Sequence, residues 1–144
     1  MKISSTIILT TLAVSFTGCT EDLQNCPSKM CIVAGGWKLT EAYVDNVKED
    51  GDLSLYRLIL YTPVPETSET SDFDRIQPSG NWDNGAWSIA NNGTVLTLTP
   101  GNNVQFTENW IIESMTPRRL VLVMSRNTGI KQGPSVIRFI LEPL

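Results

Sequence analysis

The feature that most constrains the fold is a series of short stretches, from Gly36 to the end of the chain, in which apolar and polar residues alternate. Such alternation is typical of strands with one buried face. Turn residues separate the stretches, and Asn91-Asn92-Gly93 is typical of a hairpin because Asn and Gly accept positive φ values. We expect about eight strands, over residues 36–44, 53–61, 72–77, 85–90, 94–99, 104–114, 120–124 and 136–141.

Strands at this spacing, with no helical period after the leader, predict an all-β domain, and the 144 residues suffice for one domain. Consecutive hairpins favour an eight-stranded antiparallel up-and-down barrel over a sandwich, because closing the sheet removes its exposed edges. The side chains expected to point inwards are apolar and large. They are Trp37, Leu39, Trp87, Ile89, Leu96, Leu98, Phe106, Trp110, Leu120, Leu122 and Met124.

The first residues have the pattern of an export signal. Lys2 gives a positive start, and residues 7–16 form an apolar core too short to span a bilayer. The following Phe16-Thr17-Gly18-Cys19 resembles the lipobox of bacterial lipoproteins, where cleavage precedes a lipidated cysteine; an ordinary secretory signal cleaved elsewhere is the alternative. The expected organisation is a signal peptide at 1–18, a lipidated N-terminus and tether at 19–34, and the barrel at 35–144.

Lipidation of Cys19, for example by palmitate, predicts that the mature protein is anchored to a membrane. More than one acyl chain makes such attachment stable, since each buried methylene contributes about 0.8 kcal/mol. Thr20-Glu21-Asp22 resembles the acidic surface-export signal of lipoproteins in the Bacteroides group. The expected location is therefore the outer membrane, on its periplasmic face or at the cell surface.

Lipidation of Cys19 leaves two cysteines, Cys26 and Cys31. In an oxidising compartment a pair with four intervening residues is most simply a disulfide. A redox or metal pair is the alternative, but the C-x-x-C spacing is missing, and no metal or cofactor is expected.

The chain has no histidine and a formal charge of −4, which bounds its chemistry. Histidine is the commonest general base and metal ligand, so its absence argues against an enzyme. Catalysis would need paired carboxylates or a lysine, and Glu41, Glu108 and Glu113 have no spacing that distinguishes them. The acidic balance also argues against nucleic acid as a partner, because phosphates require clustered Lys and Arg.

Gly35-Gly36-Trp37-Lys38-Leu39 resembles the G-x-W signature of lipocalin-like barrels. Residues 85–89, 109–112 and 120–122 follow in an order similar to that of small lipocalin-like domains in lipoproteins of the Bacteroides group, and the resemblance covers residues 35–143. The chain departs from secreted lipocalins in its shorter length and in lacking a helix after the barrel. The resemblance implies that Trp37 closes the barrel base and that Arg138 packs over it. Alternation in the last strand would instead turn Arg138 outwards.

A small hydrophobic or amphipathic molecule is the ligand that this resemblance implies. Trp87, Phe106 and Trp110 are the residues expected to contact it, because aromatic side chains dominate such pockets. The alternative is a filled barrel without a small ligand. Such a protein would act as an interaction or inhibitor module of the cell envelope, through the loops at 45–52 and 62–72.

Overall fold

A computed structural model describes residues 29–65, 67–101, 104–127 and 133–144. In these residues one short helix precedes nine strands, and single turns of 3-10 helix separate the fifth strand from the sixth and the sixth from the seventh. The elements are α1 (Met30–Val33), β1 (Gly35–Val44), β2 (Val47–Lys48), β3 (Arg57–Leu60), β4 (Thr70–Ile76), β5 (Trp82–Ala90), η2 (Asn91–Gly93), β6 (Val95–Pro100), η3 (Val104–Phe106), β7 (Glu108–Thr116), β8 (Arg119–Arg126) and β9 (Ser135–Pro143).

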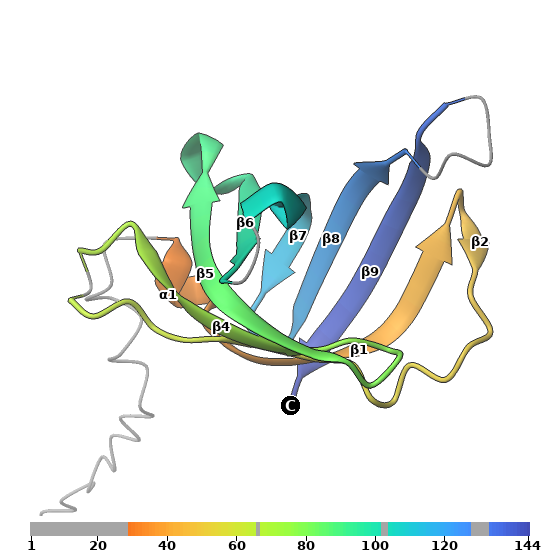
Figure 1. Cartoon of the computed structure of the whole chain (residues 1–144), viewed down its shortest axis with the longest axis horizontal. Helices are drawn as coiled ribbons and strands as arrows, with labels where there is room; N and C mark the ends of the chain where they lie inside the picture. Colours follow the sequence, from red (N-terminus) through yellow and green to blue (C-terminus); the bar gives the residue numbers. More distant parts are fainter. Residues whose placement is uncertain (1–28, 66, 102–103, 128–132) are drawn as a thin grey trace, which may run out of the picture.

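The strands form an antiparallel up-and-down barrel, as predicted. Strands β3 to β9 pair in sequence order, β1 pairs with β3 on one side, and β1 pairs with β9 on the other. The β1–β9 pairing closes the sheet, and Figure 1 shows these two strands side by side. The two-residue β2 pairs only with the last two residues of β1 and is not part of the barrel wall, which therefore has eight strands.

The barrel has two ends, which the strand register defines. The base end holds the start of β1, where Trp37 pairs with Pro143 and Gly35 pairs with Leu60. The mouth end holds the start of β5, the end of β6, η3 and the start of β7, because Ile76 pairs with Trp82 and Leu98 with Glu108.

The connection from β6 to β7 corrects the prediction of a strand over residues 104–114. Residues 104–106 form η3 instead, and β7 begins only at Glu108. Phe106 consequently leaves the inward set, and 67% of it is exposed at the mouth. The alternation of apolar and polar residues in the sequence continues through Phe106. The strand does not, because residues 104–106 connect β6 to β7.

Two glycine-containing positions shape the β5–β6 hairpin. Asn91, Asn92 and Gly93 all have positive φ, as the turn prediction requires. At Gly85 a Cβ atom would lie 2.1 Å from the carbonyl oxygen of Thr99, so only glycine lets β5 and β6 approach this closely.

Large side chains fill the barrel interior. The core residues are at most 5% exposed, and partly buried apolar side chains such as Met124, Ile137 and Phe139 pack against them. The aromatic rings contact each other at the mouth side of this core: Phe139 lies 5.6 Å from Tyr56 and 4.9 Å from Trp110 between ring centroids. The buried core comprises Met30, Val33, Trp37, Leu39, Ala42, Tyr56, Leu58, Leu60, Phe73, Trp87, Leu96, Leu98, Trp110, Leu120, Leu122 and Leu141.

The base is closed by α1 together with Trp37, whose indole N–H donates a 2.8 Å hydrogen bond to the Val33 carbonyl oxygen. Met30 and Val33 are buried in the core. Residues 30–34, predicted to be part of the tether, therefore pack with the barrel.

Arg138 does not pack over Trp37, which corrects the expectation from the lipocalin resemblance. Arg138 pairs in register with Tyr43, six residues along β1 from Trp37, and its guanidinium binds Glu113 with N–O distances of 2.9 and 2.5 Å. The side chain is 40% exposed. The alternation of side chains along β9 therefore turns Arg138 outwards.

Several predictions fall on residues 1–28, outside the described part of the chain. These are the signal peptide, lipidated Cys19 and the pairing partner Cys26. Cys31, which is described, is disulfide-bonded. Among the described residues, no helix has both the length and the apolar character needed to cross a membrane.

Candidate functional site

A charged side chain lies in the barrel interior near the mouth. Arg75 is on β4, two residues after Phe73, so alternation turns both side chains inwards. Only 3% of Arg75 is exposed, and its guanidinium carbon lies 5.8 Å from the centre of the Phe73 ring. Because a buried charge requires paired partners, this position determines what must surround it.

Two carboxylates satisfy the guanidinium of Arg75. Its Nε and Nη2 donate to Asp83 at 2.9 and 2.6 Å, in a bidentate pair across β4 and β5. Its Nη1 donates to Glu108 at the start of β7, at 2.7 Å. We call these three residues the mouth ion cluster. Bidentate geometry of this kind gives strong, well-oriented hydrogen bonds.

Further hydrogen bonds fix the mouth ion cluster to the core below it. The Trp110 indole N–H donates to Glu108 Oε2 at 2.9 Å. With its amide oxygen turned towards Arg75, Gln77 accepts from Nε and Nη2 at 3.0 Å. The cluster thereby joins three strands and forms a polar layer over the aromatic core.

Burial has opposite consequences for two ionisable groups in this layer. Desolvation raises the pKa of the buried Tyr56 phenol above its ordinary value of 10.0, so Tyr56 stays neutral. For Arg75 desolvation lowers the pKa, but the hydrogen bonds that its guanidinium donates to Asp83 and Glu108 raise the pKa by more. Arg75 therefore remains a cation at every pH at which the protein folds.

Above the mouth ion cluster lies an open depression of about 780 Å³. A smaller one of about 380 Å³ adjoins it, and Phe106, Glu108 and Arg126 line both. We call the two together the mouth depression. Its lining combines one exposed aromatic ring with charged and amide groups, a set that suits an amphipathic molecule.

The structure separates the three residues predicted to contact a ligand. Trp87 is 1% exposed, and its indole N–H donates to the Tyr61 carbonyl oxygen at 3.1 Å. Trp110 is 3% exposed and forms part of the floor beneath the mouth through its bond to Glu108. Phe106 alone is open to the mouth depression. Whether any of them binds a ligand stays a prediction.

Sequence reasoning did not find Arg75 or Asp83. A charged residue between Asp74 and Ile76 matches the solvent-facing side of a strand as readily as the buried side. The available signal was register: Phe73 and Arg75 share a face, and the apolar Phe73 belongs inside. In the sequence Glu108 looks like Glu41 and Glu113, which form ion pairs with Lys48 and Arg138. Only its position opposite Arg75 in the structure distinguishes it.

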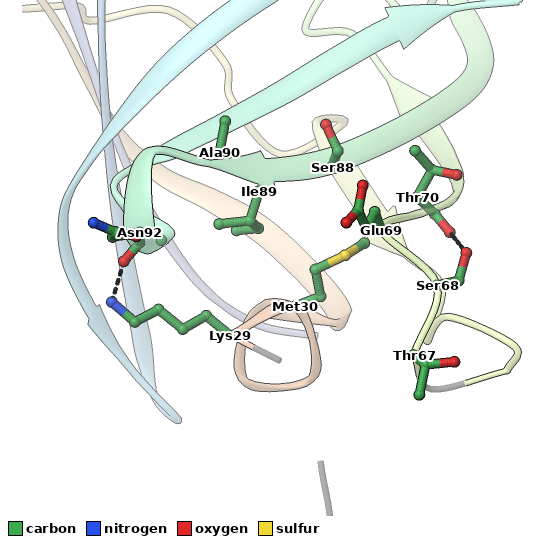
Figure 2. A pocket seen from close by; sticks show the side chains of 11 residues that line it. Lys29, Met30, Thr67, Ser68, Glu69, Thr70, Ser88, Ile89, Ala90 and Asn92 are labelled. Atoms are coloured by element: carbon green, nitrogen blue, oxygen red, sulfur yellow. Dashed lines mark hydrogen bonds between the residues drawn. The ribbon is translucent and has the colours of Figure 1, made fainter. Parts of the chain in front are cut away.

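A second depression, of about 710 Å³, lies at the base end beside α1. Figure 2 shows Lys29 and Met30 on one side of it, residues 67–70 on another and Ile89 of β5 above. Its polar groups bind each other: Ser68 donates to the Thr70 carbonyl oxygen, and Lys29 donates to that of Asn92. It contains no aromatic ring and no buried charge, so the mouth depression is the better candidate.

Among the described residues, no group of three or more His, Cys, Asp or Glu side chains could hold a metal ion. Two carboxylates are among the described residues that line the mouth depression, and both bind Arg75. What the arrangement can do chemically is offer hydrogen-bond acceptors beside an exposed ring.

Comparison with solved structures finds lipocalin-like proteins. One is a lipocalin-like protein from Bacteroides uniformis, 10% identical, covering 78% of this chain and 99% of that one with a TM-score of 0.46. Another is a dog lipocalin allergen, 16% identical, covering 76% and 72% with a TM-score of 0.47. An uncharacterized protein from Bacteroides eggerthii is 11% identical and covers 77% and 98% with a TM-score of 0.42.

No protein-family model matches the sequence, and no curated protein matches it either. The lipocalin-like character of the fold rests on the barrel itself, with eight antiparallel strands in sequence order closed by the first and the last. The fold is compatible with binding of a small molecule.

Replacement of Arg75 by Met tests whether the mouth ion cluster stabilises the barrel. Arg75→Met leaves Asp83 and Glu108, which are 29% and 26% exposed, without their cation. We expect the free energy of unfolding, measured in urea, to fall by about 3 kcal/mol. The matched variant Arg138→Met removes an ion pair that is 40% and 47% exposed and should cost about 0–1 kcal/mol. Equal losses in both variants would contradict the assignment.

The raised pKa of Tyr56 predicts a particular loss of stability at high pH. The pKa of the Tyr56 phenol is higher in the folded than in the unfolded chain. Its contribution to the stability of the fold is therefore complete below about pH 10 and decreases progressively above it. When the pH is raised from about 8 to about 11, the free energy of unfolding of Tyr56→Phe should fall by about 1 kcal/mol less than that of the unsubstituted protein. Urea unfolding at both pH values measures this. Tyr61→Phe provides the comparison: a surface hydrogen bond to Asp74, more than burial, raises the pKa of the Tyr61 phenol, so its effect should be smaller than that of Tyr56→Phe.

Proposed function

We propose that this protein is a lipid-anchored barrel of the outer membrane that binds a small amphipathic molecule at its mouth. The observation that carries the binding proposal is the mouth depression, in which the exposed Phe106 ring lies beside the polar mouth ion cluster. A filled interior leaves this end as the place where an eight-stranded barrel of this kind can take a ligand.

A bound molecule would use both parts of the mouth depression. Its apolar portion would lie on Phe106, which is 67% exposed, and remove this ring from water. Its polar portion would meet Glu108, Asn81 and Asn84, which line the depression. The proposed ligand differs from that of a deep calyx, because part of it remains at the surface.

The anchoring part of the proposal is supported by the sequence. Cys19 follows the short apolar leader, and the ten residues from Cys19 to Ser28 lead into Lys29 at the base end. At about 3.5 Å per residue this segment reaches at most about 35 Å. An anchor at Cys19 would hold the base near the membrane, while the mouth lies at the opposite end of the barrel.

A second candidate is an interaction module without a small ligand, favoured by the filled interior. Trp82 and Leu55 are 62% and 52% exposed near the mouth end, and exposed tryptophans are common at protein interfaces. Neither candidate includes catalysis, since the chain has no histidine and Glu41 and Glu113 lie in surface ion pairs.

Nile red, an uncharged amphipathic dye, tests binding at the mouth. We expect a saturable rise in its emission with the mature protein, and about two- to tenfold weaker binding to Phe106→Ala, because an aromatic contact is lost. Ile111→Ala, which removes an exposed side chain from the β7 wall, should bind as the unsubstituted protein does. Absence of saturable binding, or equal loss in both variants, would favour the interaction module.

Metabolic labelling tests the anchor separately. Cells expressing the full chain with labelled palmitate should yield a labelled protein in the outer-membrane fraction, because acyl chains make attachment stable. Cys19→Ser should abolish both the label and the membrane association. A Cys19→Ser protein that remains in that fraction would show that something other than lipidation holds it there.

A further inference from the structure

We infer that the ligand of the mouth depression is an amphipathic cation, with an amine directed at the carboxylates of Asp83 and Glu108 and an apolar part on Phe106. This inference rests on the proposed function and specifies the chemical class of the ligand. It identifies Glu108 as a residue that determines specificity.

The mouth ion cluster presents mainly its carboxylates to an approaching molecule, although Arg75 also lines the mouth depression. Arg75 is 3% exposed, whereas Asp83 is 29% and Glu108 26% exposed. Because the cation lies beneath the two anions, a ligand meets oxygen atoms first. The accessible surface of the cluster is therefore a hydrogen-bond acceptor with negative character.

All three guanidinium nitrogens of Arg75 already have acceptors. Nε, Nη1 and Nη2 donate to Asp83 and Glu108, and the Gln77 amide oxygen lies 3.0 Å from two of these nitrogens. A ligand carboxylate could reach the guanidinium only by displacing Asp83 or Glu108. It would also lose its hydration beside two like charges, which is unfavourable. The floor of the mouth thus disfavours fatty-acid-like anions.

An amine can be accepted without breaking the cluster. A carboxylate has about four lone-pair positions, and the bonds to Glu108 from Arg75 and Trp110 both reach its Oε2 atom. The exposed part of Glu108 is where an N–H donor can approach from the mouth. Hydrogen bonds from a charged donor to a carboxylate are stronger than those between neutral groups.

Phe106 suits the rest of such a molecule. Its ring lines both parts of the mouth depression, as Glu108 does. An alkyl chain can pack on the ring, and an ammonium group near its face gains a cation–π contact. The two residues together therefore recognise a cation with an apolar portion.

Arg126 is an exposed cation of the mouth depression and opposes this selection. It lines both depressions, is exposed at the end of β8, and would repel an ammonium group. The net charge of the chain, −4, acts the other way, although salt screens it beyond about 8–10 Å. Opposite effects are consequently expected from removing the charges of Glu108 and Arg126.

Competition between dodecylamine and dodecanoate for the Nile red site of the mature protein tests the inference. These probes have equal chains and opposite charges, and both are used below their micellar concentrations at neutral pH. We expect dodecylamine to bind about tenfold more tightly than dodecanoate. Glu108→Gln should reduce this preference about fivefold, and Arg126→Gln should increase it by a similar factor.

Glu113→Gln makes the same chemical change on the outer wall, where Glu113 pairs with Arg138, and should leave the preference unchanged. Equal affinities for the two probes, or a preference that Glu108→Gln and Arg126→Gln do not shift in opposite directions, would overturn the inference while Nile red binding still supports the proposed function. Absence of Nile red binding would overturn both. If Glu108→Gln fails to fold, the surface variant Arg126→Gln decides.

Discussion

The pairing of β1 with β9 is the constraint on which the rest of this structure depends. Because it closes the sheet, each of the eight wall strands has a neighbour on both sides, and every inward side chain faces the same enclosed space. That space must then be filled or lined. Here large apolar side chains fill it, and α1 with Trp37 closes one end.

The polar mouth follows from the same constraint. Alternation in β4 that buries Phe73 also turns Arg75 into the barrel, so closure would bury an unpaired charge unless the facing strands supplied partners. β5 supplies Asp83 and β7 supplies Glu108. The resulting layer has its cation inside and its anions outside. A stabilising arrangement therefore also determines the chemical character of the surface above it.

Most of the fold could be predicted from the sequence, because turn residues and alternation are local signals. The positive φ values of Asn91 to Gly93 and the inward direction of Trp37, Trp87 and Trp110 follow from them. Phe106 could not be placed by alternation, since the pattern continues through η3 although the strand does not. Contacts between distant residues left no local signal: Arg75 and Glu108 are 33 positions apart and meet only through the register of four strands.

A site at the mouth of a filled barrel has different physical properties from a deep calyx. A ligand lying on Phe106 buries only part of its surface, so the gain from apolar burial is modest and must offset the freedom lost on binding. Polar contacts at Glu108 then contribute a larger share of the selectivity than they would in an enclosed apolar cavity. Differences in affinity between related complexes lie mainly in the dissociation rate. Under the proposed function, such a site would exchange its ligand readily while the anchor holds the opposite end of the barrel at the membrane.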